Sequence, residues 1–196
     1  MTNSGSKEQQ DKFVLKFIPQ GFFLDLGSQH PEQYNNTFLL EQKNWNGILI
    51  EKDEKYLEYT KEIRKSPIYC IDCDNINWLE FLQKNNVPKV IDYISADLDD
   101  SNINFIETFP FDQYEFKIMT FETDLYKTTA RKTAAMQVLS KYNQYKMVLE
   151  NGQLFDGRVW EDWWVNEKFI DCKDFYSNNI RWSDFVDRLY KKNMLL

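Results

Sequence analysis

Several short apolar runs of the sequence carry an acidic residue at or near their end. The runs are FFLDL, GILIE, IYCID, VIDYISADL and FKIMTFET, and the acids are Asp25, Glu51, Asp72, Asp97, Asp99 and Glu122. Carboxylates accept hydrogen bonds from hydroxyl groups, bind hard cations and take up protons. Any single acid could instead cap a following helix, but capping is a weaker explanation for the whole set. The pattern therefore indicates a ligand site where these runs end.

Glu51 is the most informative of these acids, because a carboxylate can accept hydrogen bonds from both ribose hydroxyls of a nucleoside. The alternative is a surface position at the start of the charged stretch EKDEK. Asp25 and Gly27 mark an earlier turn, where a glycine permits close approach and backbone N–H groups could contact a ligand. The SQHPEQYNN that follows contains no G-x-G-x-x-G, so no pyrophosphate cradle is predicted. A cofactor with ribose and adenine but no pyrophosphate fits better, and S-adenosylmethionine has this composition.

The elements that must position these acids alternate along the chain. Apolar runs typical of buried strands alternate with amphipathic stretches typical of helices. The expected strands are 22–26, 47–51, 68–72, 90–98, 116–123, 145–150 and 158–165, and the expected helices are 35–44, 53–65, 77–85, 103–109 and 128–142. This predicts an α/β fold, a doubly wound and mostly parallel sheet with helices on both faces and an antiparallel C-terminal hairpin. Ligands in such sheets bind at the carboxyl ends of the strands. We expect a single domain over residues 1–196, with residues 1–12 flexible.

The chain resembles the FkbM-type S-adenosylmethionine-dependent methyltransferases, which have the class I methyltransferase (Rossmann-like) fold. The resemblance lies in GFFLDLGS, NNTFLLEQKNWNGILIE, IDYISADLDD, FKIMTFETDLY and WEDWWV, in that order, and spans residues 21–165. Two departures are visible. Family members usually carry a second glycine in the first loop, where this chain has Gln29-His30-Pro31. They often have Glu-His-Asn after the fifth strand, where this chain has Glu122-Thr123-Asp124.

The resemblance implies a role for particular residues. The implied cofactor contacts are Asp25, Gly27, Ser28, Glu51 (to the ribose), and Asp72 and Cys73 (near the adenine). It also implies that Asp97 lies beside the methyl group and the substrate. We therefore expect a methyltransferase that modifies a hydroxyl of a sugar or another small polar acceptor, with Asp97 as base or positioning group and Glu122 in support. The alternative is a non-catalytic module that keeps the fold but has lost tight cofactor binding.

Three further features allow more than one interpretation. Asp97, Glu122 and Asp124 offer the oxygen ligands that Mg²⁺ prefers, although Asp124 could simply cap the next helix. His30, the only histidine, could act as a base, but a solvated loop position is the more common case. The cluster Trp160, Trp163 and Trp164 could form a substrate wall, with core packing as the safer interpretation.

Composition narrows the class of protein. The net charge of −7 over 196 residues disfavours a nucleic-acid partner, because affinity for phosphate backbones comes from clustered Lys and Arg. Cys70 and Cys73 form a C-x-x-C, but without a second pair or a histidine cluster it predicts reduced thiols rather than a zinc site. No stretch is apolar enough for a membrane span or a leader. We therefore expect a cytoplasmic enzyme whose partner is a small-molecule or glycan acceptor.

Overall fold

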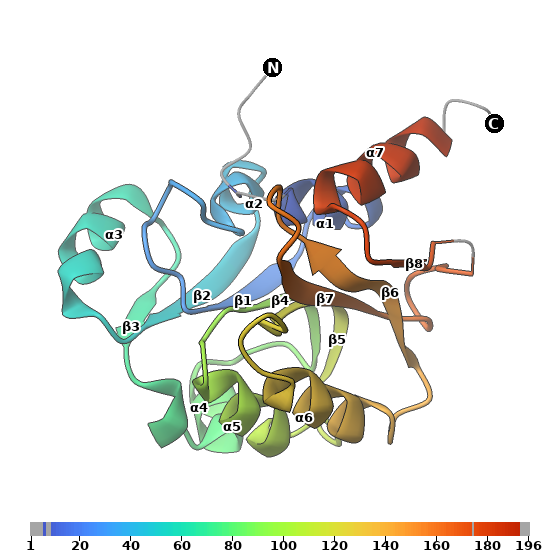
Figure 1. The fold of residues 1–196 in the computed structure, drawn as a ribbon. Helices are drawn as coiled ribbons and strands as arrows, with labels where there is room; N and C mark the ends of the chain where they lie inside the picture. The colour runs from blue at the N-terminus through green and yellow to red at the C-terminus, as the bar shows by residue number, and fades with distance from the viewer. Residues whose placement is uncertain (1–5, 7–8, 174, 193–196) are drawn as a thin grey trace.

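The computed structural model describes residues 6, 9–173 and 175–192, and its centre is one eight-stranded sheet in the order β3-β2-β1-β4-β5-β7-β6-β8 (Figure 1). The strands are β1 (Phe22–Leu26), β2 (Asn46–Glu51), β3 (Ile68–Cys70), β4 (Val90–Ala96), β5 (Glu115–Glu122), β6 (Tyr145–Gln153), β7 (Val159–Asn166) and β8 (Ser177–Asn178). From β3 to β5 all neighbours are parallel, and β7 is antiparallel to both β5 and β6. The predicted doubly wound, mostly parallel sheet is confirmed.

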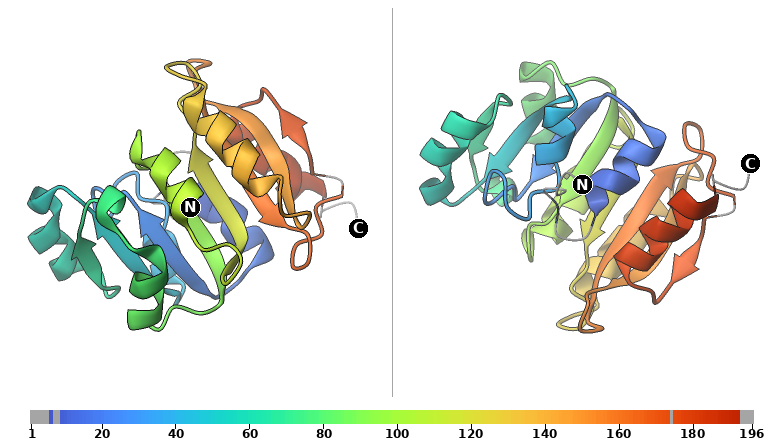
Figure 2. Two further views of the ribbon diagram at one scale, coloured as in Figure 1. Left: turned by 90° about the horizontal axis from the view of Figure 1, so that it is seen from below. Right: turned by 90° about the horizontal axis from the view of Figure 1, so that it is seen from above.

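The helices cover both faces of this sheet (Figure 2). They are α1 (Gln10–Phe17), α2 (Phe38–Gln42), α3 (Leu57–Ile63), α4 (Trp78–Lys84), α5 (Ser101–Thr108), α6 (Ala130–Leu139) and α7 (Trp182–Lys192), with 3-10 turns η1 (Glu54–Tyr56) and η2 (Cys73–Asn75). The helices α4, α5 and α6 lie on one face, and α1, α2 and α7 lie on the other (Figure 1). The central strands are apolar on both sides because both sides are covered.

The covered faces form two hydrophobic cores. The core under α4, α5 and α6 contains Trp78, Phe105 and Phe116. The core under α1, α2 and α7 contains Phe13, Trp163 and Trp182. Each of these six side chains is at most 2 % exposed. The two cores hold the central strands rigidly, and with them the residues at the strand ends.

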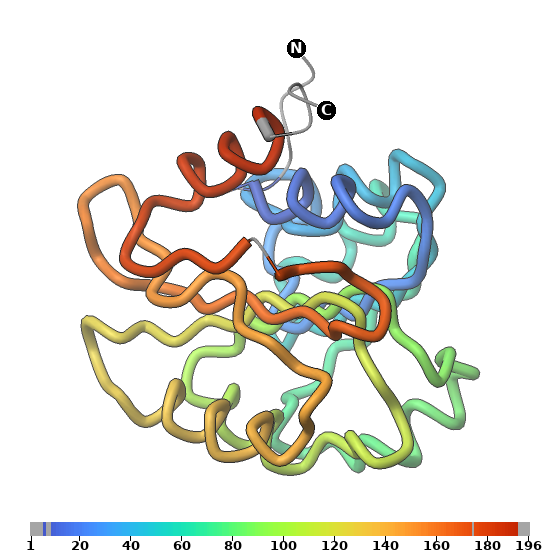
Figure 3. The backbone as a smooth tube through the Cα atoms, turned by 90° about the vertical axis from the view of Figure 1, so that its right-hand side faces the viewer, coloured from blue at the N-terminus to red at the C-terminus, as the bar shows by residue number. Residues whose placement is uncertain are grey.

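Two helices and one strand of the structure lie outside the predicted elements. Helix α1 begins at Gln10, inside the segment expected to be flexible, and both Gln10 and Asp11 are buried; residues 1–5 and 7–8 lie outside the described residues. Helix α7 packs beside α1 although the two come from opposite ends of the chain (Figure 3). Strand β8 pairs in parallel with β6 and forms the far edge of the sheet.

The antiparallel pair of β6 and β7 was predicted, but its placement differs from a simple edge hairpin. After β6 the chain turns back and inserts β7 between β5 and β6. This brings Glu161 directly opposite Glu122 and Trp163 opposite Thr120, so β7 contributes side chains to the region beyond β5.

Over the described part of the chain, no helix is both long enough and apolar enough to cross a bilayer.

Candidate functional site

Three adjoining pockets lie at the carboxyl ends of β1, β2, β4 and β5. The first is lined by Ile50, Glu51, Asp72, Cys73 and Leu98. The second is lined by Asp25, Ser28, His30, Asn36 and Ser95. The third is lined by Gln10, Glu122, Lys127, Trp160 and Trp182. Asp97 and Gln29 line all three pockets, so the pockets form one continuous site around Asp97.

Glu51 lies at the floor of the first pocket and is 6 % exposed. One carboxylate oxygen accepts the backbone N–H of Gln29 at 2.8 Å, and the other accepts that of Asp53 at 2.8 Å. A carboxylate has about four acceptor positions, so each oxygen keeps a lone pair for a ligand. Glu51 therefore has a defined orientation and free acceptor capacity, and the alternative of a solvated surface glutamate is wrong.

Asp72 and Cys73, which the resemblance places near the adenine, line the same pocket. The Asp72 carboxylate accepts the N–H of Asp74 at 3.2 Å and begins the turn η2. Burial raises the pKa of the Cys73 thiol to about 12, with the nearby charge of Asp72 adding to the effect. The thiol therefore stays protonated and apolar. All three cysteines are free.

The first three backbone N–H groups of the loop after β1 bond within the protein and are not free to contact a ligand, contrary to expectation. The N–H groups of Gly27 and Ser28 both donate to the carbonyl of Ile50, at 2.9 and 3.1 Å, and the N–H of Gln29 binds Glu51. The turn is thus fastened to the end of β2. Gly27 has a positive φ of 80°, and a methyl group on its Cα would lie 1.9 Å from the carbonyl oxygen of Asp97. This glycine is required for contact with β4, not for contact with a phosphate.

Beneath this loop, a buried polar network ties Asp25 to an arginine that the sequence analysis did not single out. Thr37 donates its hydroxyl to Asp25 at 2.6 Å, and the Arg64 guanidinium binds Thr37 at 2.9 Å, Asn35 at 3.1 Å and Glu41 at 3.1 Å. Burial raises the pKa of Asp25. Each of these five residues is at most 5 % exposed. The conspicuous NNTFLLE motif is therefore a structural support for the first loop.

The second pocket lies against this network. Ser28 is 5 % exposed, and its hydroxyl oxygen has no hydrogen-bond partner. Asn36 donates to the Ser95 hydroxyl at 3.0 Å on the opposite wall. His30 uses Nδ1 to accept the N–H groups of Glu32 and Gln33, at 3.2 and 3.0 Å. Because Nδ1 is occupied in holding the loop, His30 acts here as a turn residue.

The tryptophan cluster divides between core and pocket. Trp163 and Trp164 are 0 % and 4 % exposed and lie in the two cores. Trp160 is half-buried and lines the third pocket, with its ring stacked on Tyr126 at a centroid distance of 5.6 Å. The cations of Arg158 and Lys127 lie over the same two rings. The third pocket thus has an aromatic wall with a basic rim and an acidic floor.

The acidic floor is a cluster at the ends of β4 and β5. Burial raises the pKa of Asp97 to about 6, and the charge of Asp99 adds to this rise. Burial also raises the pKa of Glu122 well above its usual range, with Asp97 and Asp124 adding to the effect and Arg131 opposing it. Both carboxyls therefore hold their protons to a higher pH than exposed acids do. Carboxyls with raised pKa values that line a pocket are candidates for proton transfer.

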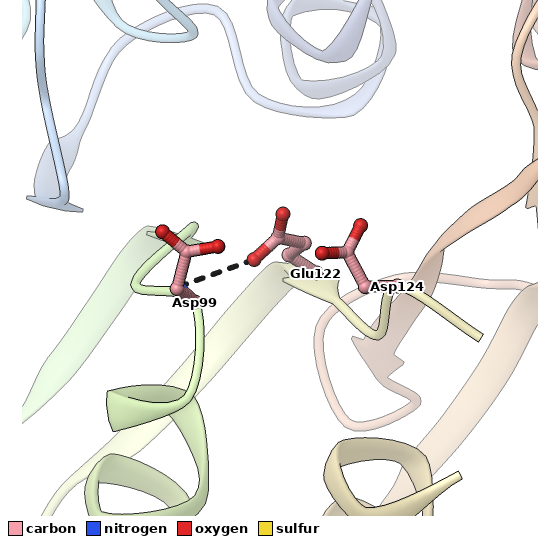
Figure 4. A group of neighbouring side chains, drawn as sticks. All are labelled: Asp99, Glu122 and Asp124. Atoms are coloured by element: carbon pink, nitrogen blue, oxygen red, sulfur yellow. Dashed lines mark hydrogen bonds between the residues drawn. The ribbon is translucent and has the colours of Figure 1, made fainter. Parts of the chain in front are cut away.

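The metal ligands expected from sequence were Asp97, Glu122 and Asp124, but the structure brings a different set together. Carboxylate oxygens of Asp99, Glu122 and Asp124 lie within 4.8 Å of one another, and the side chains rise side by side from the strand ends (Figure 4). Asp97 is not a member of this group; the chain turns at Asp99, where φ is 53°. The position of Arg131 is also unexpected. Its Nη1 lies 2.9 Å from Glu122 Oε2 and 2.9 Å from Asp124 Oδ2. The donor set is therefore already paired with a cation.

No protein-family model matches the sequence, and no curated protein is similar to it in sequence. Solved structures do match the fold. An O-methyltransferase from Bacillus cereus, in complex with SAH, has a TM-score of 0.59 at 13 % identity, covering 83 % of each chain. TrmK from M. capricolum, in complex with SAH, has a TM-score of 0.54 at 15 % identity, covering 86 % of this chain and 70 % of that one. The fold is that of the class I methyltransferases. Spermidine synthase from Thermotoga maritima shares it, with a TM-score of 0.58 at 15 % identity, covering 97 % of this chain and 73 % of that one.

The class I methyltransferase fold accounts for the strand order and for the side of the sheet on which the pockets lie. The first-loop glycine, the acid closing β2 and the acid following β4 were all found from sequence. The two buried arginines, Arg64 and Arg131, were missed because each pairs with acids that are distant in sequence or beyond a loop.

Proposed function

We propose that this protein is an S-adenosylmethionine-dependent methyltransferase of the FkbM type. The proposal rests above all on Glu51. This buried carboxylate closes the floor of a pocket at the end of β2, keeps free acceptor positions, and lies in the same continuous site as Asp97. An adenosine ribose presents two adjacent hydroxyl donors, which is the complement of such a carboxylate. The fold of two SAH-bound neighbours supports the same assignment.

The residues of the first and second pockets fit this cofactor. Glu51 would hold the ribose, and Asp72 and Cys73 would border the adenine, for which a protonated thiol provides an apolar contact. The unpartnered hydroxyl of Ser28 and the side chain of Asn36 would face the methionine portion in the second pocket. S-adenosylmethionine supplies, when bound, a methyl group that is already electrophilic.

The third pocket would receive the methyl acceptor, which we propose to be a hydroxyl of a sugar or another small polar molecule. Trp160 offers a flat apolar face of the kind on which a sugar ring packs. Asp97 lines both the cofactor pockets and this pocket. Its ionised carboxylate would orient the acceptor hydroxyl and take its proton as the C–O bond forms and the sulfonium S–CH₃ bond breaks, with S-adenosylhomocysteine as the leaving group. Glu122, at the end of β5, would support Asp97 in this role.

Calorimetric titration with S-adenosylmethionine tests this function. We expect micromolar binding, and we expect Glu51→Gln to weaken it by about 1–3 kcal/mol, roughly 5- to 150-fold. Glu54→Gln is the matched control, because Glu54 is an exposed acid on the next turn. If the wild type gives no heat at millimolar ligand, the non-catalytic module is the correct assignment. The three loop N–H groups committed to Ile50 and Glu51 are the observation that favours this alternative.

Methyl transfer to a panel of sugars and small hydroxyl compounds tests the acceptor. General base catalysis typically contributes 10²–10⁴-fold in rate, so Asp97→Asn should lose about that much activity. The variant should retain cofactor affinity, because Glu51 is unchanged. Equal activity of Asp97→Asn and the wild type would remove Asp97 from the base role.

A further inference from the structure

The acidic cluster of Asp99, Glu122 and Asp124 has the composition of a divalent-cation site, yet Arg131 lies among its oxygens. Its Nη1 bridges Glu122 and Asp124 at 2.9 Å each, and its Nη2 reaches Asp100 at 3.0 Å and Asp99 at 3.6 Å. We propose that the Arg131 guanidinium is the built-in cation of this site and excludes a divalent metal from it. Removing that side chain would then convert the cluster into a metal site.

The geometry leaves no room for both cations. Mg²⁺ holds its oxygen ligands at about 2.0–2.1 Å. An ion held by the same two oxygens that Nη1 bridges would therefore overlap the guanidinium or lie very close to its positive charge. Arginine keeps its proton at any pH at which the protein is folded, so the arginine cannot make way by becoming neutral. A metal could enter only by displacing the side chain.

Displacement of Arg131 is opposed by its burial. The residue is 2 % exposed and belongs to helix α6, which packs on α5. Removing one member of a buried, hydrogen-bonded ion pair leaves an uncompensated charge and typically costs about 3–5 kcal/mol. The guanidinium is thus part of the folded core at the strand ends.

The cluster nevertheless has capacity for a metal once the arginine is absent. Asp124 is completely buried, and its Oδ1 has no hydrogen-bond partner, while Oδ2 binds Arg131 and Lys127. In Figure 4 the carboxylates of Asp99, Glu122 and Asp124 project in the same direction from the strand ends. Mn²⁺ and Mg²⁺ bind hard oxygen ligands of this kind. Without Arg131, the cluster would offer such oxygens, including the unpaired Oδ1 of Asp124.

The proposal also assigns Arg131 a positioning role. By binding Glu122 from β5 and Asp100 from the loop after β4, it fixes the two segments on either side of Asp97. Arg131, and not an exchangeable metal ion, would then supply the positive charge beside the pocket proposed for the methyl acceptor. This part rests on the proposed function; the exclusion of metal does not.

Titration of the full chain with Mn²⁺ tests whether Arg131 excludes a metal. The EPR signal of the free ion measures how much Mn²⁺ remains unbound. After metal has been removed with EDTA, the wild type should bind no more Mn²⁺ than the Asp124→Asn variant does. Arg131→Met should gain one site, and the double change Arg131→Met with Asp124→Asn should lose it. Lys132→Met is the matched control, because the neighbouring Lys132 pairs with Glu150 and Asp162, outside the cluster. It should gain no site.

Two results would overturn the proposal. One is wild-type protein that binds Mn²⁺ in a manner that depends on Asp124. The other is folded Arg131→Met, verified by circular dichroism, that binds no more Mn²⁺ than Lys132→Met. If Arg131→Met does not fold, the wild-type titration still decides, and Arg131→Lys, which keeps the cation, should bind no metal. Because the readout is metal binding, absence of methyl transfer would count against the proposed function and leave this inference standing.

Discussion

Gly27 and Asp97 are in contact through their backbones. A methyl group on the Cα of Gly27 would lie 1.9 Å from the carbonyl oxygen of Asp97, and the φ of Gly27 is 80°. The loop that follows β1 and the end of β4 therefore meet without an intervening side chain. This contact places the first and second pockets next to the acidic floor of the third.

Gly27→Ala is expected to destabilise the fold and to abolish S-adenosylmethionine binding. Gly157 provides the control, because its φ is 85° but nothing lies within 4 Å of the position of its Cβ. Gly157→Ala should cost about 1–2 kcal/mol, the usual penalty for a side chain in the left-handed region. Gly27→Ala should cost more, since the clash adds to the strain. Urea unfolding measures both; equal losses would show that the contact with Asp97 is unimportant.

Arg64 should be essential to stability although it lies outside all three pockets. Its side chain is fully buried with that of Glu41, 3.1 Å away. Arg64→Met would leave Glu41 as an unpaired buried charge and should lower the free energy of unfolding by about 3–5 kcal/mol. The adjacent Lys65 is exposed, so Lys65→Met should change stability little. A similar loss in both variants, measured by denaturant titration, would contradict the assigned role.

The pH dependence of methyl transfer should report the environment of Asp97. Burial, with the charge of Asp99 adding to it, raises the pKa of Asp97 to about 6. The base must be ionised, so kcat/KM should fall as the pH decreases through this raised pKa. Asp99→Asn removes a neighbouring negative charge, so the pKa of Asp97 should fall and the acidic limb should move to lower pH.

Asp100→Asn is the control for that shift. Asp100 follows Asp99 directly but directs its carboxylate to Arg131 and is exposed. Its replacement should leave the limb in place. An identical displacement in both variants would mean that the effect is a general change of charge and does not act specifically on Asp97.

Trp160 and Trp163 should differ in what their removal changes. Trp160 is half-buried on the wall of the third pocket, and Trp163 is fully buried under α1 and α7. Trp160→Ala should raise the KM for the acceptor with a small effect on stability. Trp163→Ala should lower the free energy of unfolding by about 3–5 kcal/mol. If Trp160→Ala left acceptor kinetics unchanged, the acceptor would not contact this wall.

The strands of this fold are predictable because their apolar runs and terminal acids are local features of the sequence. The acids Asp25, Glu51 and Asp72 could be placed at one edge of the sheet for the same reason. Helix α7 was also visible in principle, since Trp182, Phe185, Val186 and Leu189 recur at helical spacing and are buried. Helix α1 is harder to predict, because its short apolar part follows a polar segment.

The remaining parts of the site depend on tertiary packing. Asp99, and not Asp97, joins Glu122 and Asp124 in the acidic group, which the sequence LDD does not reveal. Neither Arg131 nor Arg64 stands out in the sequence. The partners of Arg131 come together only when α6 packs on α5. Those of Arg64 come together only when the segment after α3 meets the first loop. The position of β7 between β5 and β6 depends on a long-range pairing with β5. This pairing places Trp160 at the third pocket.

The pairing of α1 with α7 affects how the protein forms during synthesis. The rings of Phe13 and Phe185 lie 5.8 Å apart, and the Tyr190 hydroxyl donates to the carbonyl of Lys12 at 3.0 Å. Helix α1 leaves the ribosome early, whereas α7 is the last helix in the described chain. Until α7 is translated, the apolar face of α1 has no complete cover and is open to chaperones and to aggregation. This side of the sheet can therefore close only after α7 has been synthesised.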